Sequence, residues 1–202
     1  MALWRAAAPL VLASRSNIRR ALLTAAGVAV ETAPSDVDER AVEAAAPALS
    51  PAAAAGLLAR AKATAIARHY PGRLVLGADQ VLALDGKRFT KPADLSAARA
   101  QLRRLAGRSH QLHSAIAFVQ DETVLLEHVS TASLTMRAFS DEFLELYLEA
   151  AGAAVTESVG AYQLEGLGVQ LFERVEGDYF TVLGLPLLAA MDFLRRRGCL
   201  LQ

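Results

Sequence analysis

The order of short apolar runs and helix-starting residues limits the fold of this chain more than any other feature. Leu10–Ala13 is apolar, and it is followed directly by Ser14-Arg15-Ser16-Asn17, whose side chains favour the N-cap of a helix over its interior. Apolar residues then recur at helical spacing as far as Gly27, a residue type suited to a left-handed C-terminal position. We therefore predict that the chain opens with a strand, a polar loop and a helix.

The same alternation continues along the chain. Further strands are expected at residues 28–32, 74–84, 110–119 and 123–136, and further helices at 50–69, 94–105, 140–151 and 187–197. Polar loops are expected at 34–40 and 87–92, and the glycine-rich stretch before Pro186 is expected to be β-like. This mixture predicts an α/β protein with a mixed sheet and flanking helices, divided into two lobes around a central cleft. Residues 1–202 show no repeat and no long linker, so we expect a single domain.

Composition excludes several classes of protein. The 21 Lys and Arg residues balance 21 Asp and Glu residues, so the surface has no overall field for holding a nucleic acid polymer or an anionic membrane. An anionic ligand must then be held by a local cluster. A single cysteine, Cys199, excludes an intrachain disulfide framework and fits a reducing compartment. No apolar run reaches the roughly 18 residues that span a bilayer, so we expect a cytoplasmic protein without a transmembrane helix.

The first candidate cluster lies at the turn from the first strand to the first helix. Free backbone amides at a helix N-terminus attract anions, and arginine adds paired hydrogen bonds to phosphate oxygens. The residues concerned are Ser14, Ser16, Asn17, Arg19 and Arg20. They could form a phosphate cradle. The alternative is that Ser16 or Asn17 simply caps the helix while both arginines are solvated.

The second candidate is Gly77-Ala78-Asp79-Gln80, which places an acid at the end of an apolar run. A carboxylate in this position can hold Mg²⁺ or accept a proton from an attacking water molecule, although it could also cap a neighbouring amide. Lys91 follows across the Asp85-Gly86 turn, so a hairpin could return its ammonium group to Asp79. Lys62 lies in the helix expected at 50–69. Taken alone, either lysine is better explained by solvation.

The third candidate is the glycine-rich segment 160–168, which contains Glu165. Glycines let the backbone approach a flat or charged ligand, and Glu165 could accept hydrogen bonds from the edge of a base. A set of tight turns explains the glycines equally well. His110 and His113 fall on opposite faces of an expected strand, which argues against joint metal ligation.

Taken together, several ordered blocks resemble the Maf family, named as septum formation inhibitors, from about residue 10 to about residue 197. The blocks are Leu12–Arg20, Gly77–Val81, Lys91-Pro92, Gly160–Gly168, Glu176–Asp178 and Val182–Pro186. The resemblance implies a nucleoside triphosphate pyrophosphatase that cuts between the α- and β-phosphates with a divalent cation, Mg²⁺ or Mn²⁺. A homodimer is left open.

Residue roles follow from the same resemblance. Asp79 matches the family's proton acceptor, and Glu39 joins Asp79 at the metal site. The positions assigned to the substrate are Ser14, Ser16, Arg19, Arg20, Lys62, Gln80, Lys91 and Glu165.

The resemblance also bears on the base. Gln80 and Glu165 resemble the branch that acts on 7-methyl-GTP more than the branch that acts on dTTP and UTP. Ile18, however, stands where that branch often has an aromatic residue, and it cannot stack on a cationic base as an aromatic ring would. Two other functions remain as alternatives: a nucleotide-binding regulator of cell division whose catalysis is incidental, and a phosphatase that removes only the γ-phosphate.

Overall fold

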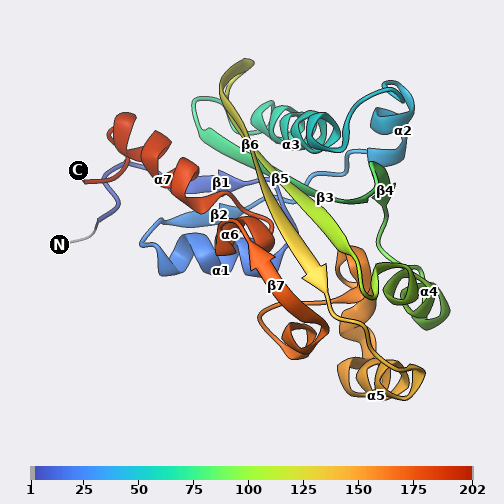
Figure 1. Cartoon of the computed structure of the whole chain (residues 1–202). Coiled ribbons are helices and arrows are strands. Elements are labelled where there is room, and N and C mark those ends of the chain that lie inside the picture. Colours follow the sequence, from blue (N-terminus) through green and yellow to red (C-terminus); the bar gives the residue numbers. More distant parts are fainter. Residues whose placement is uncertain (1–2, 202) are drawn as a thin grey trace.

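A computed structural model of the chain describes residues 3–201, and it is built on one mixed sheet with helices on both faces (Figure 1). The strand order is β2-β1-β3-β5-β6-β7, and β4 pairs with β3 outside this path. β1 runs parallel to both β2 and β3, whereas the other pairings are antiparallel. The predicted α/β class is confirmed.

The elements have the following bounds. The strands are β1 (Leu10–Leu12), β2 (Val30–Thr32), β3 (Leu74–Leu84), β4 (Lys87–Phe89), β5 (Ser109–Gln120), β6 (Thr123–Met136) and β7 (Phe172–Glu176). The α-helices are α1 (Asn17–Ala25), α2 (Glu39–Ala44), α3 (Pro51–Ala67), α4 (Leu95–Leu105), α5 (Asp141–Ala151), α6 (Tyr179–Val182) and α7 (Leu187–Arg196). Three 3₁₀ helices are η1 (Gly152–Thr156), η2 (Val159–Ala161) and η3 (Leu167–Leu171).

The opening unit has the predicted strand, loop and helix. β1 is fully buried, and the Ser16 hydroxyl caps α1 by accepting a hydrogen bond from the Arg19 amide at 3.3 Å. The helix stops before Gly27, whose φ of +79° is easily reached only by a residue without a Cβ. Local sequence therefore decides where this helix begins and ends.

The helix α3 lies directly on the central strand β3. Its buried face is mostly alanine, and a Cβ added to Gly77 of β3 would lie 2.1 Å from the carbonyl oxygen of Ala59. Small side chains on both elements thus allow the helix and strand backbones to come very close. This explains why an Ala-rich segment, whose helix starts at the predicted Ser50 cap, belongs to the core.

The strand β3 changes partner along one of its edges. Val75 and Leu76 pair with β1, whereas Leu82–Leu84 pair with β4. Between these two ladders, residues 78–81 have no paired strand on that side, although β5 runs along the other edge throughout. Such a break leaves backbone groups free for side chains or ligands, as at the switch points of open α/β sheets. Asp79 and Gln80 lie in this gap.

The apolar core forms three clusters. One cluster packs α1 and α7 against one face of the sheet, and a second packs α3 against the other face. The third surrounds α4 and α5, which lie together at one end of the sheet (Figure 1). Within residues 3–201, no helix has both the length and the apolar character needed to cross a membrane.

Two sequence-based expectations about the loops were wrong. Residues 87–92 were expected to be a loop, but Lys87–Phe89 forms β4, because the left-handed turn at Asp85 (φ 52°) and Gly86 (φ 74°) closes a hairpin with β3. Residues 34–40 were also assigned to a loop. Glu39 instead begins α2, since the Asp38 carboxylate accepts a hydrogen bond from the Ala41 amide and caps the helix.

The glycine-rich segment before Pro186 is also different from the expectation. It contains one strand, β7, and is otherwise built of the three 3₁₀ helices, the short helix α6 and turns. Glycines here permit a left-handed backbone at Gly160 (φ +83°) and a close approach at Gly168, where an added Cβ would lie 2.4 Å from the Gln163 carbonyl oxygen. These are turn and packing roles, so the glycines did not mark a series of strands.

Candidate active site

The carboxylate of Asp79 is the buried acid in the gap of β3. Its side chain is 10% exposed, and its Oδ1 accepts a hydrogen bond from Lys62 Nζ at 2.5 Å. Burial raises the pKa of Asp79 above its ordinary value, and the nearby charges of Lys62 and Arg19 oppose that rise. No described residue within 3–201 donates a side-chain hydrogen bond to Oδ2. A carboxylate with a raised pKa and one uncommitted oxygen is suited to accept a proton.

Lys62 connects two carboxylates that come from different elements. Its Nζ lies 2.7 Å from Glu39 Oε1 as well as 2.5 Å from Asp79 Oδ1. The lysine is on α3, Glu39 is the first residue of α2, and Asp79 is in the middle of β3. The close packing of α3 on β3 places this lysine over the strand. We call Glu39, Lys62 and Asp79 the charged triad.

Arg19 fills the open edge of β3 beside the triad. Its Nη1 donates to the Ala78 carbonyl at 2.8 Å and to Ser14 Oγ at 3.2 Å, while its Nε donates to the Gly184 carbonyl at 2.8 Å. Burial lowers the pKa of Arg19, and the carboxylates of Asp79 and Glu39 oppose that shift. The guanidinium is thus held in a fixed orientation by three separate segments of the chain.

Gln80 lies on the opposite face of the sheet from Asp79. Its Nε2 donates to Ser114 Oγ at 3.0 Å and to the carbonyl oxygens of Thr181 and Val182 at 3.1 and 3.0 Å. Ser114 in turn donates to the Thr181 carbonyl at 2.7 Å. We call Gln80, Ser114 and Thr181 the amide network. Sequence reasoning missed Ser114 and Thr181, and a lone serine within the apolar run of β5 was the only available signal.

The remaining residues assigned to the substrate are placed differently. Ser16 caps α1, which agrees with the alternative interpretation of that residue. Arg20, Lys91 and Glu165 are exposed, and within residues 3–201 none of them has a hydrogen bond or ion pair with the charged triad. The hairpin does not bring Lys91 into contact with Asp79 in the structure. A ligand would have to bridge these residues to the triad.

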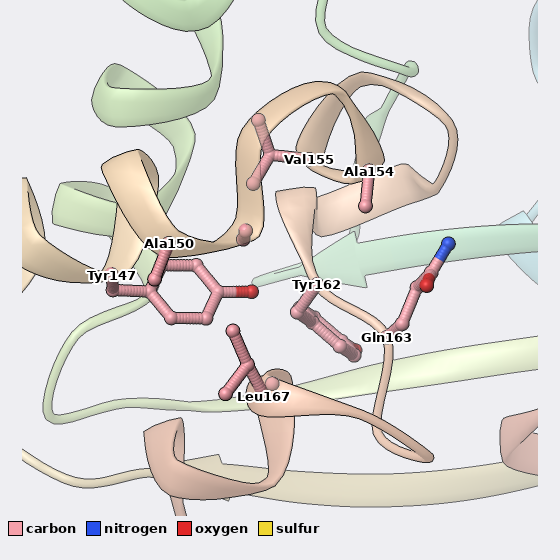
Figure 2. A pocket seen from close by; sticks show the side chains of 9 residues that line it. Tyr147, Ala150, Ala154, Val155, Tyr162, Gln163 and Leu167 are labelled. Atoms are coloured by element: carbon pink, nitrogen blue, oxygen red, sulfur yellow. The ribbon is translucent and has the colours of Figure 1, made fainter.

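Two cavities lie away from Asp79. Figure 2 shows the first, of about 180 Å³, where Tyr147 of α5 faces Tyr162 and Leu167. The second, of about 290 Å³, adjoins the turn at Asp85. Neither cavity is lined by the charged triad, so neither is a pocket at Asp79.

The ligand set for a metal ion is small. Residues 3–201 contain no group of three or more His, Cys, Asp or Glu side chains that could together hold a metal ion. Glu39 and Asp79 form a pair that converges on one cation, the Lys62 ammonium group. Mg²⁺ is often held by only one or two carboxylates when substrate phosphates and water complete its shell. The pair therefore fits a cation that is shared with a polyanionic ligand.

Fold and site together define an α/β protein in which a buried carboxylate contacts a lysine and lies within the electrostatic influence of an arginine, at the point where the central strand changes partner. Such a constellation suits proton transfer beside a polyanion. The family model for Maf-like proteins matches residues 9–197, and the chain belongs to this family.

Curated relatives match the chain over nearly its whole length. It is 52% identical over 200 residues to a nucleoside triphosphate pyrophosphatase of Rhodopseudomonas palustris strain HaA2, with 99% of each chain covered. It is 50% identical over 193 residues to a 7-methyl-GTP pyrophosphatase of Mesorhizobium japonicum, with 95% of this chain and 97% of the relative covered. The chain is an enzyme of the same family.

A solved structure of a HAM1 protein from Coxiella burnetii is also similar. It has 17% sequence identity and a TM-score of 0.42, and the match covers 63% of this chain and 72% of that one. A likeness at this level carries no argument about function.

Proposed function

We propose that this enzyme hydrolyses a nucleoside triphosphate between the α- and β-phosphates and releases a nucleoside monophosphate and pyrophosphate. The observation that carries the proposal is the buried Asp79 carboxylate in the gap of β3, which contacts Lys62 and feels the charge of Arg19. The names of the relatives support the same reaction. The proposal places the enzyme in the cytoplasm, with a nucleoside triphosphate as its partner.

Asp79 acts as the general base in this proposal. Its carboxylate accepts a proton from a water molecule that attacks the α-phosphorus, and the bond between that phosphorus and the bridging oxygen to the β-phosphate breaks. A positioned base of this kind contributes about 10²- to 10⁴-fold to the rate. The raised pKa of Asp79 brings its basicity closer to neutral pH, which favours the transfer.

The cations act on the phosphates. Arg19 has its orientation fixed by hydrogen bonds to the Ala78 and Gly184 carbonyls, so the rest of its guanidinium can meet a phosphate oxygen without reorganisation. Lys62 and the exposed Lys91 add positive charge for the leaving pyrophosphate. Ser14 already accepts a hydrogen bond from Arg19.

Glu39 and Asp79 are the residues that would hold a divalent cation. Such a cation, when bound, polarises the phosphate oxygens and offsets their negative charge. Glu39 is suited to contact it from the solvent side because its side chain is 55% exposed.

For the base, we propose a guanine nucleotide of the 7-methyl-GTP type over dTTP or UTP. The amide nitrogen of Gln80 is already committed to the chain, so its Oε1 is the atom left to face a ligand. This oxygen and the exposed carboxylate of Glu165 both accept hydrogen bonds. Guanine offers two neighbouring donors on its pairing edge, N1–H and the N2 amino group, whereas uracil and thymine offer a single N3–H between two acceptor oxygens.

The test is a comparison of kcat/KM for 7-methyl-GTP, dTTP, UTP and CTP with Mg²⁺ or Mn²⁺, together with product analysis. We expect pyrophosphate as the released product and the highest kcat/KM for 7-methyl-GTP. Orthophosphate as the only released product would replace this activity with removal of the γ-phosphate. Absence of any release from a broad panel of triphosphates would reject hydrolysis altogether.

A further inference from the structure

The ammonium group of Lys62 occupies the point where the two carboxylates of the charged triad meet. Its Nζ contacts Glu39 Oε1 at 2.7 Å and Asp79 Oδ1 at 2.5 Å. The side chains of Lys62 and Asp79 are only 12% and 10% exposed, so solvent screens this contact weakly. Both carboxylates that would bind a divalent cation therefore already contact a cation of the chain itself.

A divalent cation and this ammonium group cannot both keep their places. They would compete for the same two carboxylate groups, and two positive charges a few ångströms apart repel strongly in a partly buried site. One of them has to move. Lysine carries its charge on a flexible four-carbon stem, so it can turn away without disturbing the backbone.

Arg19 shows by contrast what a fixed cation looks like. Its guanidinium donates to the carbonyls of Ala78 and Gly184 and to Ser14 Oγ, and all three partners are electrically neutral. A divalent cation at the carboxylates would remove none of these bonds. Lys62 has only the two carboxylates as partners among residues 3–201, so the same event would release it completely.

We propose that Lys62 is an exchangeable counterion, which holds the metal-binding carboxylates of Glu39 and Asp79 in the nucleotide-free protein and leaves them when a divalent cation arrives. The released ammonium group then faces the phosphates, so that the negative charge of the incoming triphosphate offsets the positive charges of both the divalent cation and the displaced lysine. This proposal rests on the metal dependence of the proposed function. Its consequence is that divalent cation and nucleotide bind with positive coupling, because the cation alone must first displace Lys62.

The test measures Mn²⁺ binding without turnover, by electron paramagnetic resonance and calorimetry at pH 8 with no nucleotide present. We expect Lys62→Met to bind Mn²⁺ at least about tenfold more tightly than the wild type. The gain should disappear when Asp79→Asn is added to Lys62→Met. Lys91→Met is the matched control, because it also removes one lysine charge but does not touch the carboxylates, and its Mn²⁺ affinity should equal that of the wild type.

Equal or weaker Mn²⁺ binding by Lys62→Met would overturn the proposal, provided that circular dichroism shows a folded protein. Lys62→Gln serves if the methionine variant does not fold. In the wild type, a non-hydrolysable α,β-methylene triphosphate should tighten Mn²⁺ binding, and the absence of such coupling would also overturn the proposal. A protein that releases no pyrophosphate but gains Mn²⁺ affinity in Lys62→Met would retain this inference and lose the proposed function.

Discussion

The two faces of β3 differ sharply at neighbouring residues. Asp79 points towards α3 and lies in a cluster of full charges with Lys62 and Glu39. Gln80 points to the other face and lies among neutral donors and acceptors from β5 and the segment after Asp178. Both faces are partly buried, but only one of them carries charge.

This difference separates two tasks. Each member of the charged triad is held by an ion pair with another member, so an ionic ligand can take the place of one member of such a pair. The amide network has its donor nitrogen already satisfied by chain atoms, so it holds the 181–184 segment in place. Arg19 joins the two faces, because it contacts Gly184 on one side and the Ala78 carbonyl beside Asp79 on the other. In the proposed function, the charged face carries the chemistry and the neutral face positions the segment that follows Asp178.

Asp79→Asn gives the largest expected effect on the charged face. The amide cannot accept the proton of the attacking water, so kcat should fall by about 10²- to 10⁴-fold. Nucleotide binding should persist, as measured by calorimetry with a non-hydrolysable analogue. The control is Asp85→Asn, which changes an exposed carboxylate at the end of the same strand and should leave kcat unchanged. A similar loss of kcat in both variants would show that the charged face has no special role.

Gly77→Ala tests how far the charged face depends on the contact between α3 and β3. The added methyl group would meet backbone atoms of Ala59 and Ala63, so the free energy of unfolding should fall by about 3 kcal/mol. Gly56→Ala is the matched control within α3, because its Cβ meets only the Val129 side chain at 3.6 Å. The free energy of unfolding of Gly56→Ala should stay within about 1 kcal/mol of the wild-type value, since alanine favours a helix. Urea denaturation measures the free energy of unfolding of both variants. An equal decrease in the two would contradict the argument that α3 and β3 are closely packed at Gly77.

Gln80→Leu probes the neutral face. The leucine removes the side-chain donor of the Val182 carbonyl, whereas the Thr181 carbonyl keeps the Ser114 hydroxyl as a donor, and the loss should cost about 1–3 kcal/mol of stability. We expect KM for the nucleotide to rise more than kcat falls, because the variant loosens positioning and spares the base. Gln111→Leu, at an exposed site on β5, is the control. A loss of kcat as large as that of Asp79→Asn would erase the distinction between the two faces.

The smallest expected effect is on pH dependence. The pKa of Asp79 is raised chiefly by burial, so the acidic limb of kcat/KM should lie above the ordinary aspartate pKa of about 3.9. The sign for stability follows. The carboxyl group of Asp79 holds its proton more tightly in the folded protein than in the unfolded chain. Its contribution to the free energy of unfolding is therefore complete below the unfolded-state pKa and is lost as pH rises through the folded-state pKa. A pH series of urea denaturation should show this slope in the wild type, and Asp79→Asn should remove it.

Much of the fold could be predicted from local sequence. The caps at Ser16, Ser50, Asp94 and Ser140 each begin a helix where expected, because a cap acts on amides only two or three residues away. The long strands β3, β5 and β6 were also predicted correctly. The segment before Pro186 was not, since its glycines serve turns and close contacts that depend on distant neighbours.

The sequence by itself determined most of the elements and the types of residue available for chemistry, because periodicity and capping operate within a few residues. Only the tertiary structure decided that Lys62, and not Lys91, contacts Asp79, and that Glu39 joins them. It also placed Asp79 and Gln80 on opposite faces with different partners. These choices depend on strand pairing and on how closely α3 approaches β3, and both are set by contacts between residues far apart in the chain.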